Sequence, residues 1–258
     1  MSFLHALLLG LLEGVTEFLP ISSTAHLLLA EKLLHMPQTE FAKSFAIVIQ
    51  LGAILAVVAL YAKRLVGSMT ICLKILAAFV PTAIMGFVLH DLIKDVFFES
   101  TSIILWAMLI GGLVLILFEQ WHSSTSSESR AAALDRITYH QAILIGLSQS
   151  IAVIPGVSRA GATILGGLVL GLSRKAIVEF SFLLAIPTML GAVVLDLGTT
   201  GSEFSGQEWT LLAVGFVAAF LSALLSVRWL LKFIQHHSFT TFGMYRIIAA
   251  LVLWMVLY

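Results

Sequence analysis

Two short stretches of this sequence place carboxylates, hydroxyls, an imidazole and a guanidinium within otherwise apolar surroundings. The first runs from Glu13 to His26 with the sequence EGVTEFLPISSTAH. The second runs from Pro155 to Thr163 with the sequence PGVSRAGAT. Ionisable side chains inside apolar segments are costly to bury in a bilayer and usually mark a functional site. These two stretches are therefore the candidates for chemistry.

The first stretch could bind a cation and supply a nucleophile. Glu13 and Glu17 are four residues apart, which stacks them on one face of a helix, and such paired carboxylates suit a hard divalent cation, Mg²⁺ or Ca²⁺. Pro20 ends this helix, because proline lacks the N–H that a helix interior requires. Ser23 and His26 lie three residues apart at the start of the next helix, where a hydroxyl and an imidazole can act as nucleophile and proton carrier.

Each of these interpretations has a structural alternative. The two glutamates could lie at a partly hydrated helix end near the outer surface. Ser22, Ser23 and Thr24 are residue types that cap helices, so one of them could cap while another faces a substrate. A lone histidine such as His26 is often structural, but this one shares its segment with two carboxylates and three hydroxyls, so we favour a functional role.

The second stretch is suited to binding phosphate. Arg159 is a permanently charged fork that can hold phosphate oxygens at two points. Gly156 permits close approach of the backbone, and Ser158 would cap the helix that follows. Helix N-termini present free N–H groups that attract anions, so two such ends, Arg159 and a cation on the glutamates would bind a pyrophosphate. One alternative is a purely structural ion pair of Arg159 with Glu13 or Glu17, and another is a resting-state pair that opens to substrate.

Composition indicates the environment in which these residues must be positioned. Hydrophobic residues make up 60% of the 258-residue chain and charged residues only 11%, whereas soluble domains carry about 25% charged residues. At about 20 apolar residues per span, this length allows about eight to ten membrane segments. The formal net charge of zero gives no basic excess, so nucleic acid is not an expected partner. The single cysteine, Cys72, excludes an intrachain disulfide or a cysteine-based metal site.

The expected membrane helices fall into uninterrupted and interrupted segments. Uninterrupted spans are expected at 44–61, 73–90, 101–118, 176–195 and 210–230. A last apolar run at 247–258 is short, so its helix is expected to begin near residue 239, which would bury Arg246. The segments 3–34 and 141–173 are also apolar, but each is broken in its middle by a proline and polar residues.

The two halves of the chain resemble each other. The run from Ala6 to Glu13 parallels the run from Ala142 to Gln149, which makes Gln149 a further candidate to line the site, although a structural role suits it equally. Pro20 then falls opposite Pro155. Downstream, Glu40-Phe41 matches Glu179-Phe180 and Leu51-Gly52-Ala53 matches Leu190-Gly191-Ala192, both at one constant spacing. Each half is therefore predicted to contain one interrupted segment followed by three spans.

Loop charges predict how the two halves are oriented. Cytoplasmic loops are enriched in Lys and Arg, which places 62–74, 119–140 and 228–246 inside and the acidic loops 91–100 and 196–209 outside. Both ends of each interrupted segment then lie on one face. Each segment would dip into the membrane and return, which is tolerated for broken backbone that lines a polar cavity. The alternative is a pair of kinked full spans.

We therefore predict an all-α integral membrane protein with an inverted-topology repeat, a common way to build a midplane site. Each half would be a re-entrant helix hairpin plus three transmembrane helices. The single membrane domain, 1–258, would divide into a first repeat at 1–118 with hairpin 3–34, a cytoplasmic loop at 119–140, and a second repeat at 141–258 with hairpin 141–173.

The two polar motifs closely resemble those of the undecaprenyl-diphosphate phosphatase family, also called the bacitracin-resistance protein family. Weaker family-like stretches occur around Pro81 and at Tyr245-Arg246, so the resemblance covers nearly the whole chain. Small departures are Ala25, where glycine is common, and Ala160, where serine is common. Neither departure touches the proposed chemistry.

The resemblance implies hydrolysis of undecaprenyl or another polyprenyl diphosphate to the monophosphate, which recycles the lipid carrier of cell-wall synthesis. It also implies a divalent cation, and a multi-pass protein of the bacterial inner membrane whose site opens to the periplasmic face. By residue match, Ser23 is the expected nucleophile and His26 its acid/base partner, although the reverse stays open. Glu17 and Arg159 complete the catalytic group, and Glu13 and Glu17 would hold the metal. The expected substrate-binding residues are Ser22, Thr24, Gly156, Ser158, Thr163 and Gln149.

A transporter or lipid flippase is the competing hypothesis, alone or combined with the phosphatase, because inverted repeats with broken helices are its usual architecture. A channel or scaffold without catalysis is a third. The sequence leaves the oligomeric state open, a homodimer included.

Overall fold

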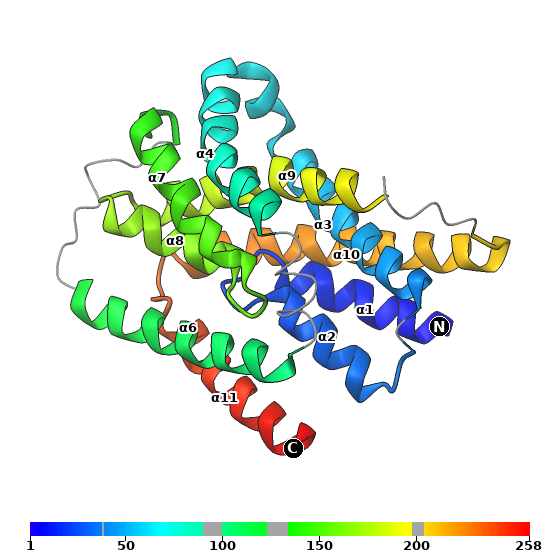
Figure 1. Ribbon diagram of the computed structural model, residues 1–258. Helices are drawn as coiled ribbons and strands as arrows, with labels where there is room; N and C mark the ends of the chain where they lie inside the picture. Colours follow the sequence, from blue (N-terminus) through cyan, green and yellow to red (C-terminus); the bar gives the residue numbers. More distant parts are fainter. Residues whose placement is uncertain (38, 90–99, 123–133, 198–203) are drawn as a thin grey trace.

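The computed structural model describes residues 1–37, 39–89, 100–122, 134–197 and 204–258, and these residues are helical apart from turns and connections (Figure 1). In chain order the elements are α1 (Phe3–Thr16), α2 (Ser23–Leu33), α3 (Glu40–Gly67), α4 (Met69–Val88), α6 (Thr101–His122), η2 (Leu134–Arg136), α7 (Tyr139–Ser150), η3 (Ile151–Val153), α8 (Arg159–Val169), α9 (Arg174–Leu197), α10 (Gly206–Phe233) and α11 (Thr240–Leu257).

Five of the described helices, α3, α4, α6, α10 and α11, are long and apolar enough to cross a membrane. Large apolar side chains such as Trp121, Phe87 and Val66 stand exposed on them, as expected for surfaces that face lipid rather than water. Each uninterrupted span predicted from the sequence corresponds to a helix in the structure, and α9 covers the predicted span 176–195. The chain is therefore a multi-pass membrane protein.

The two predicted interruptions are both present. Helix α1 ends at Thr16 and α2 begins at Ser23, so the break contains Pro20. In the second half, α7 passes through η3 before α8 begins at Arg159, and this break contains Pro155. Proline removes a helical hydrogen-bond donor and disfavours helical torsions at the residue before it. The sequence therefore stops each helix at the place where its polar residues begin.

The helices of the two halves are interleaved. Helix α1 packs along α10, and α7 packs along α4. Both contacts depend on a glycine, because a Cβ at Gly10 would lie 2.4 Å from the carbonyl oxygen of Gly215 and a Cβ at Gly146 would lie 2.0 Å from that of Ala78. Figure 1 shows α6 and α11 crossing as a further pair, which is also in contact.

The breaks are sealed by buried apolar side chains. Phe18, in the first break, is fully buried and packs edge-on against Phe182 of α9 with ring centroids 5.4 Å apart. Leu19 and Ile21 belong to the same buried cluster, which also includes Ala160 of α8. Water is therefore excluded from the backs of both breaks, and polar groups there must find partners within the protein or in a ligand.

Some of the loop residues whose charges predict the orientation lie outside the described ranges. These are residues 91–99, and portions of the loops predicted at 119–140 and 196–209. Residues 119–122 belong to the end of α6 rather than to a loop. The short last span does recruit upstream residues as expected, because α11 begins at Thr240 and buries Arg246.

Candidate active site

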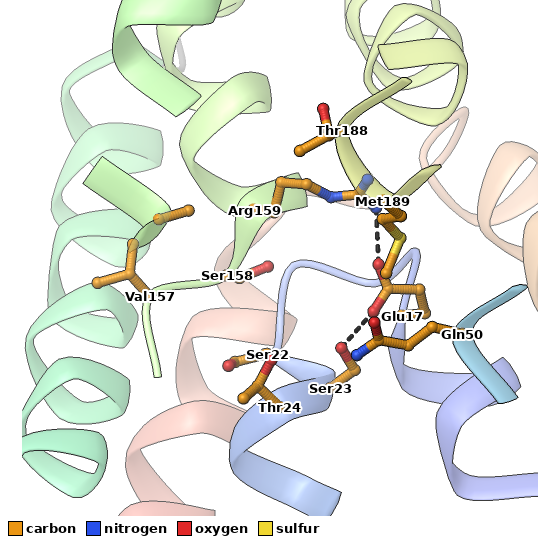
Figure 2. Close-up of a pocket in the computed structure, with 11 residues that line it drawn as sticks. Glu17, Ser22, Ser23, Thr24, Gln50, Val157, Ser158, Arg159, Thr188 and Met189 are labelled. Carbon is orange, nitrogen blue, oxygen red and sulfur yellow. Dashed lines mark hydrogen bonds and ion pairs between the residues drawn. The ribbon is translucent and has the colours of Figure 1, made fainter. Parts of the chain in front are cut away.

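The two breaks meet at one pocket, although about half of the chain separates them in sequence (Figure 2). Ser158 of the second break donates a hydrogen bond to the carbonyl oxygen of Leu19 in the first, at 3.4 Å. Helices α2 and α8 both begin beside this pocket. The residues that line it are Glu17, Ser22, Ser23, Thr24, Gln50, Ala152, Val157, Ser158, Arg159, Thr188 and Met189.

Glu17 joins the polar groups of the two breaks. Its Oε1 accepts a hydrogen bond from Nη2 of Arg159 at 2.7 Å, and its Oε2 accepts one from the hydroxyl of Ser23. Figure 2 shows this chain of contacts running from Arg159 through Glu17 to Ser23. A hydroxyl, a carboxylate and a guanidinium are thus held in direct contact in a site where Glu17 is only 7% exposed.

Arg159 uses little of its hydrogen-bonding capacity on the protein. Its Nε and Nη1 atoms are buried and have no hydrogen-bond partner. Buried polar atoms in proteins are nearly always paired, so each exception needs an explanation. A guanidinium presents its donors as a planar fork that matches phosphate oxygens. These unpaired donors are therefore suited to hold an anionic group of a ligand.

Glu13 presents the opposite need. Its side chain is fully buried, and neither carboxylate oxygen has a hydrogen-bond partner. It interacts electrostatically with Arg159 and with Glu17, and only a protonated Glu13 could hydrogen-bond to the Glu17 carboxylate. Two neighbouring carboxylates can hold a hard cation, and Mg²⁺ in particular is commonly bound by one or two carboxylates together with phosphate oxygens of a substrate. The donor set at Glu13 and Glu17 therefore fits a divalent cation.

The protein does not supply a complete cation cage at this place. Within the described ranges, no group of three or more His, Cys, Asp or Glu side chains could hold a metal. A cation on Glu13 and Glu17 would need further oxygen ligands from hydroxyls, water or a bound phosphate. This requirement favours an ion that arrives with its substrate over a structural ion.

The spacing of Ser23 and His26 suggested that their side chains form a pair, but in the structure each is hydrogen-bonded to other groups. Ser22, at φ 72°, adopts a left-handed conformation that is unusual for serine. Its carbonyl accepts a hydrogen bond from Nδ1 of His26 at 2.7 Å, and Nε2 of His26 lies 2.8 Å from the hydroxyl of Tyr245 on α11. The Ser23 hydroxyl is bonded instead to the Glu17 carboxylate, a stronger acceptor than a neutral imidazole.

These contacts determine the tautomer of His26. A carbonyl oxygen can only accept, so Nδ1 carries the hydrogen that bonds to Ser22. In the neutral ring Nε2 is then the acceptor, and the Tyr245 hydroxyl donates to it. The two rings also stack, at an interplanar angle of 9°. His26 therefore lies beside the Ser22–Ser23 turn without lining the pocket.

The second break caps and shapes its helix as expected. Ser158 accepts a hydrogen bond from the backbone N–H of Gly161 at 3.0 Å, which confirms it as the N-cap of α8. Gly156 has φ +95°, and a Cβ there would lie 2.4 Å from the carbonyl oxygen of Ile104. Gly156 thus lets the break lie against α6, but it does not line the pocket. At α2, Ser22 occupies the N-cap position without making a side-chain cap.

Two other predicted substrate-binding residues lie behind the pocket wall. Thr163 is fully buried, and its hydroxyl lies 2.6 Å from that of Ser181 on α9. Gln149 donates from Nε2 to the hydroxyls of Thr82 and Thr188, at 2.9 and 3.2 Å. Only Thr188 lines the pocket, so Gln149 reaches it through one intermediate side chain. Its Oε1 is buried without a hydrogen-bond partner, so a role for Gln149 at the site stays a prediction.

Several pocket residues were not predicted from the sequence. Gln50, Thr188 and Met189 come from α3 and α9, and they line the pocket beside the two breaks. Gln50 could have been predicted as a site residue, because it is an amide in the middle of a predicted span. Tyr245 was noted only as part of a family-like stretch, because no local pattern indicates a contact with a histidine 219 residues away.

Comparison with known proteins identifies the family. Residues 6–252 match the family described as bacitracin resistance protein BacA. The chain belongs to this family. A relative from Sulfurihydrogenibium sp. (strain YO3AOP1), named undecaprenyl-diphosphatase, is 50% identical over 252 residues, which cover 98% of each chain. Relatives of the same name from Aquifex aeolicus and Bdellovibrio bacteriovorus are 46% and 40% identical over 96% and 100% of this chain, and over 96% and 97% of their own length.

Proposed function

We propose that this protein hydrolyses undecaprenyl diphosphate to undecaprenyl monophosphate and inorganic phosphate, and so recycles the lipid carrier of cell-wall synthesis. Relatives across the full chain are named undecaprenyl-diphosphatase. The observation that carries the proposal is the pair of opposite, unmet needs of Arg159, which lines the pocket, and of Glu13, which interacts with Glu17 and Arg159 but is not among the lining residues. Arg159 offers buried donors without acceptors and Glu13 offers buried acceptors without donors, a combination that a cation-bound diphosphate satisfies. The alternative of a polyprenyl-phosphate flippase gains no support from these relatives.

The proposed reaction is a phosphoryl transfer to Ser23. Its Oγ forms a bond to the terminal phosphorus while the bridging P–O bond breaks, and undecaprenyl monophosphate leaves. The Ser23 hydroxyl proton passes to the carboxylate of Glu17, with which it is already hydrogen-bonded. Glu17 passes this proton to the departing monophosphate. Water then cleaves the phosphoserine: its oxygen and one hydrogen go to phosphorus, its other proton goes to Ser23 Oγ, and inorganic phosphate leaves. Transition states of this type are loose, so positioning and electrostatics contribute more than the strength of the base.

In this reaction His26 would act indirectly. It is bonded away from Ser23, to Ser22 and Tyr245, so it orients the turn that carries the nucleophile. The acid/base role expected from the family resemblance would require His26 to leave these two contacts. Attack by His26 in place of Ser23 remains the competing assignment, and the variants below distinguish the two.

Charge on the transferring phosphoryl group would be stabilised from the second break. Arg159 lies over the pocket with free donors, and α2 and α8 both begin there, so the partial positive charges of two helix ends point at the same place. Donors fixed in a water-poor site need no reorganisation during the reaction. Ser22, Thr24 and Ser158 would supply further hydrogen bonds from the pocket wall.

A divalent cation, Mg²⁺ or Ca²⁺, is part of the proposal. Glu13 and Glu17 would hold it beside the phosphates. When bound, it would neutralise negative charge on the diphosphate and help orient the leaving oxygen. The two unpaired oxygens of Glu13 are the feature of this chain that supports the assignment.

We also propose that the fold is an inverted repeat whose two interrupted segments are re-entrant hairpins, with repeat boundaries at 1–118 and 141–258. The exchange of helices supports it, since the first helix of each half packs on a late helix of the other, each through a glycine that matches in the two halves. The pocket supports it too. All lining residues except Thr188 form pairs at the spacing of Pro20 from Pro155 or of Leu51 from Leu190: Glu17 with Ala152, Ser22 with Val157, Ser23 with Ser158, Thr24 with Arg159, and Gln50 with Met189.

Cellular placement belongs to the same proposal. The protein would lie in the bacterial inner membrane with its pocket open to the periplasm, and it would assemble as a homodimer. Labelling of single cysteines introduced at Ser22 or Thr24 with a membrane-impermeant maleimide tests the opening, in a Cys72→Ser background. Light scattering in detergent, corrected for bound detergent, tests the assembly.

Phosphate release from undecaprenyl diphosphate by the purified protein in detergent tests the function. Wild type should release phosphate, and Ser23→Ala, Arg159→Ala and added chelator should each remove most of the activity. His26→Ala should lower the rate but leave a labelled phosphoserine detectable. In the wild-type protein, a labelled phosphohistidine at His26 would overturn the nucleophile assignment. A wild-type protein that releases no phosphate with Mg²⁺ or Ca²⁺ present would sink the proposed function.

A further inference from the structure

The largest fully buried side chain of the described protein is a charged one, Arg246 of α11, at 2% exposure. None of the ion pairs among the described residues includes it. Its guanidinium is satisfied entirely by backbone carbonyls, which accept from Nε, Nη1 and Nη2. A buried, unneutralised charge is costly in a membrane protein and points to a role beyond packing.

The identity of these carbonyls indicates that role. Nη1 donates to the carbonyl of Pro20 at 3.2 Å, and Nη2 donates to that of Gly156 at 2.9 Å. Pro20 belongs to the break that leads to Ser23, and Gly156 to the break that leads to Arg159. One guanidinium therefore joins the two turns that carry the proposed nucleophile and the proposed phosphate-binding group.

The same side chain is anchored to a helix outside both turns. Nε donates to the carbonyl of Met108 at 3.2 Å, and Nη2 donates to that of Ala107 at 3.0 Å, both on α6. The planar fork is thus held at one edge by a rigid helix while its other donors hold the two turns. A lysine, with donors on a single nitrogen at the end of a flexible stem, cannot reproduce this geometry.

The surrounding helices leave space for this arrangement. A Cβ on Gly111 of α6 would lie 2.2 Å from Nη2 of Arg246. Slightly further along, Gly112 of α6 and Gly243 of α11 face each other, and a Cβ on either would lie 2.7 Å from the carbonyl oxygen of the other. These glycines let α6 and α11 approach closely and leave room for the guanidinium to pass between α6 and the turns.

We propose that Arg246 is a positioning residue, which holds the Pro20 and Gly156 turns in the register that brings Ser23 and Arg159 to the same carboxylate, Glu17. The inference rests on the proposed phosphatase activity and adds to it a residue that does not line the pocket. Because Arg246 touches backbone rather than substrate, its loss should alter the alignment of reacting groups more than the binding of lipid. A misplacement of about 1 Å in such a site can cost about 10²-fold in rate.

The first test replaces Arg246 by lysine, which keeps the charge and removes the fork. Arg246→Lys should lower kcat by about 10²-fold, with little change in KM for undecaprenyl diphosphate. The matched control is Glu119→Gln. Glu119, also on α6, holds the backbone N–H of Phe239 and the side chain of Arg174, so it stabilises the same helix pair far from the turns. Glu119→Gln should reduce thermal stability while kcat of the folded protein stays close to wild type.

The second test moves the guanidinium without changing it. Gly111→Ala places a methyl group where Nη2 lies, and the flexible end of Arg246 can yield, so the protein should still fold. It should lower kcat in the same direction as Arg246→Lys, and the double variant should be no worse than Arg246→Lys alone because both act on one contact. Gly86→Ala on α4 is the matched control, since nothing lies within 4 Å of its added methyl group.

The outcomes separate this inference from the function on which it rests. If wild type releases no phosphate, the phosphatase proposal fails and the role of Arg246 fails with it. If wild type is active and both Arg246→Lys and Gly111→Ala keep wild-type kcat in folded protein, the positioning role is wrong and the phosphatase proposal stands. Equal losses of kcat in Arg246→Lys and in a Glu119→Gln protein of matched stability would likewise reduce Arg246 to a packing residue.

Discussion

Replacing Arg159 by lysine and by methionine tests the central electrostatic feature of the site. Arg159 spends one contact on Glu17, at 2.7 Å, and keeps Nε and Nη1 buried and unpaired. Two hydrogen bonds from these atoms to phosphate oxygens would be charge-assisted, with net values of about 1.5–3 kcal/mol each. Their loss should therefore cost about 3–6 kcal/mol in transition-state binding, or about 10²- to 10⁴-fold in kcat/KM.

The two variants divide this effect between charge and geometry. Arg159→Met removes both the charge and the donors, so its kcat/KM should be the lower of the two. Arg159→Lys keeps a charge that can still pair with Glu17 but loses the two-point contact, so its kcat/KM should lie between those of Arg159→Met and wild type. Arg64→Lys is the matched control, because Arg64 makes a comparable ion pair with Glu179, at 3.1 Å, outside the pocket.

The assay is phosphate release at saturating Mg²⁺ over a range of undecaprenyl diphosphate concentrations in detergent. Thermal unfolding of each variant establishes that folded protein is being compared. An Arg159→Met protein that folds and keeps kcat/KM within about tenfold of wild type, or about 1.4 kcal/mol, would refute the reasoning. The unpaired donors would then have no role in holding phosphate.

Three further predictions follow from individual contacts. Glu13→Gln should raise the Mg²⁺ concentration needed for half-maximal activity by about tenfold or more, which corresponds to about 1.4 kcal/mol. A cation titration measures this concentration, and an unchanged value would remove Glu13 from the cation site. Tyr245→Phe removes the hydroxyl that donates to His26, so kcat should fall about two- to tenfold for one hydrogen bond of about 0.5–1.5 kcal/mol, and a wild-type rate would count against a role for this contact. Gly146→Ala would place a methyl group 2.0 Å from the backbone oxygen of Ala78, so it should destabilise the protein by about 1–3 kcal/mol. The control is Gly67→Ala, whose methyl group would lie in open space and should not shift the unfolding temperature.

The positions of the helices and breaks could be predicted because local rules determine them. Apolar runs of membrane length specify the spans. Pro20 and Pro155 mark the breaks because each stands among polar residues, whereas Pro81 and Pro187 lie inside α4 and α9 without ending them. Ser158 was expected to cap α8 for the same local reason, and it does. The burial of Arg246 followed from the length that α11 needs to cross the membrane.

The partners of the polar side chains could not be predicted in the same way. Ser23 and His26 share a helix face, but the left-handed backbone at Ser22 turns a carbonyl toward His26, and Tyr245 comes from the last helix. Gln50 stands out as an amide in the middle of a predicted span, but its place in the sequence does not indicate that it lies beside the two breaks. Such contacts depend on how helices from distant parts of the chain pack, and spacing along one segment does not contain that information.

The contact between Arg159 and Glu17 favours a ligand site over a purely structural ion pair. A pair that served stability alone would gain most from a two-point contact that satisfied both groups. Here only Nη2 is engaged, two nitrogens of Arg159 stay unpaired, and both oxygens of the neighbouring Glu13 stay unpaired as well. Each buried, unpaired group costs about 1–3 kcal/mol or more, so the arrangement lowers stability as it stands. A bound cation and diphosphate would satisfy all of these atoms together, and the cost is then recovered as binding energy at the place where the phosphoryl group reacts.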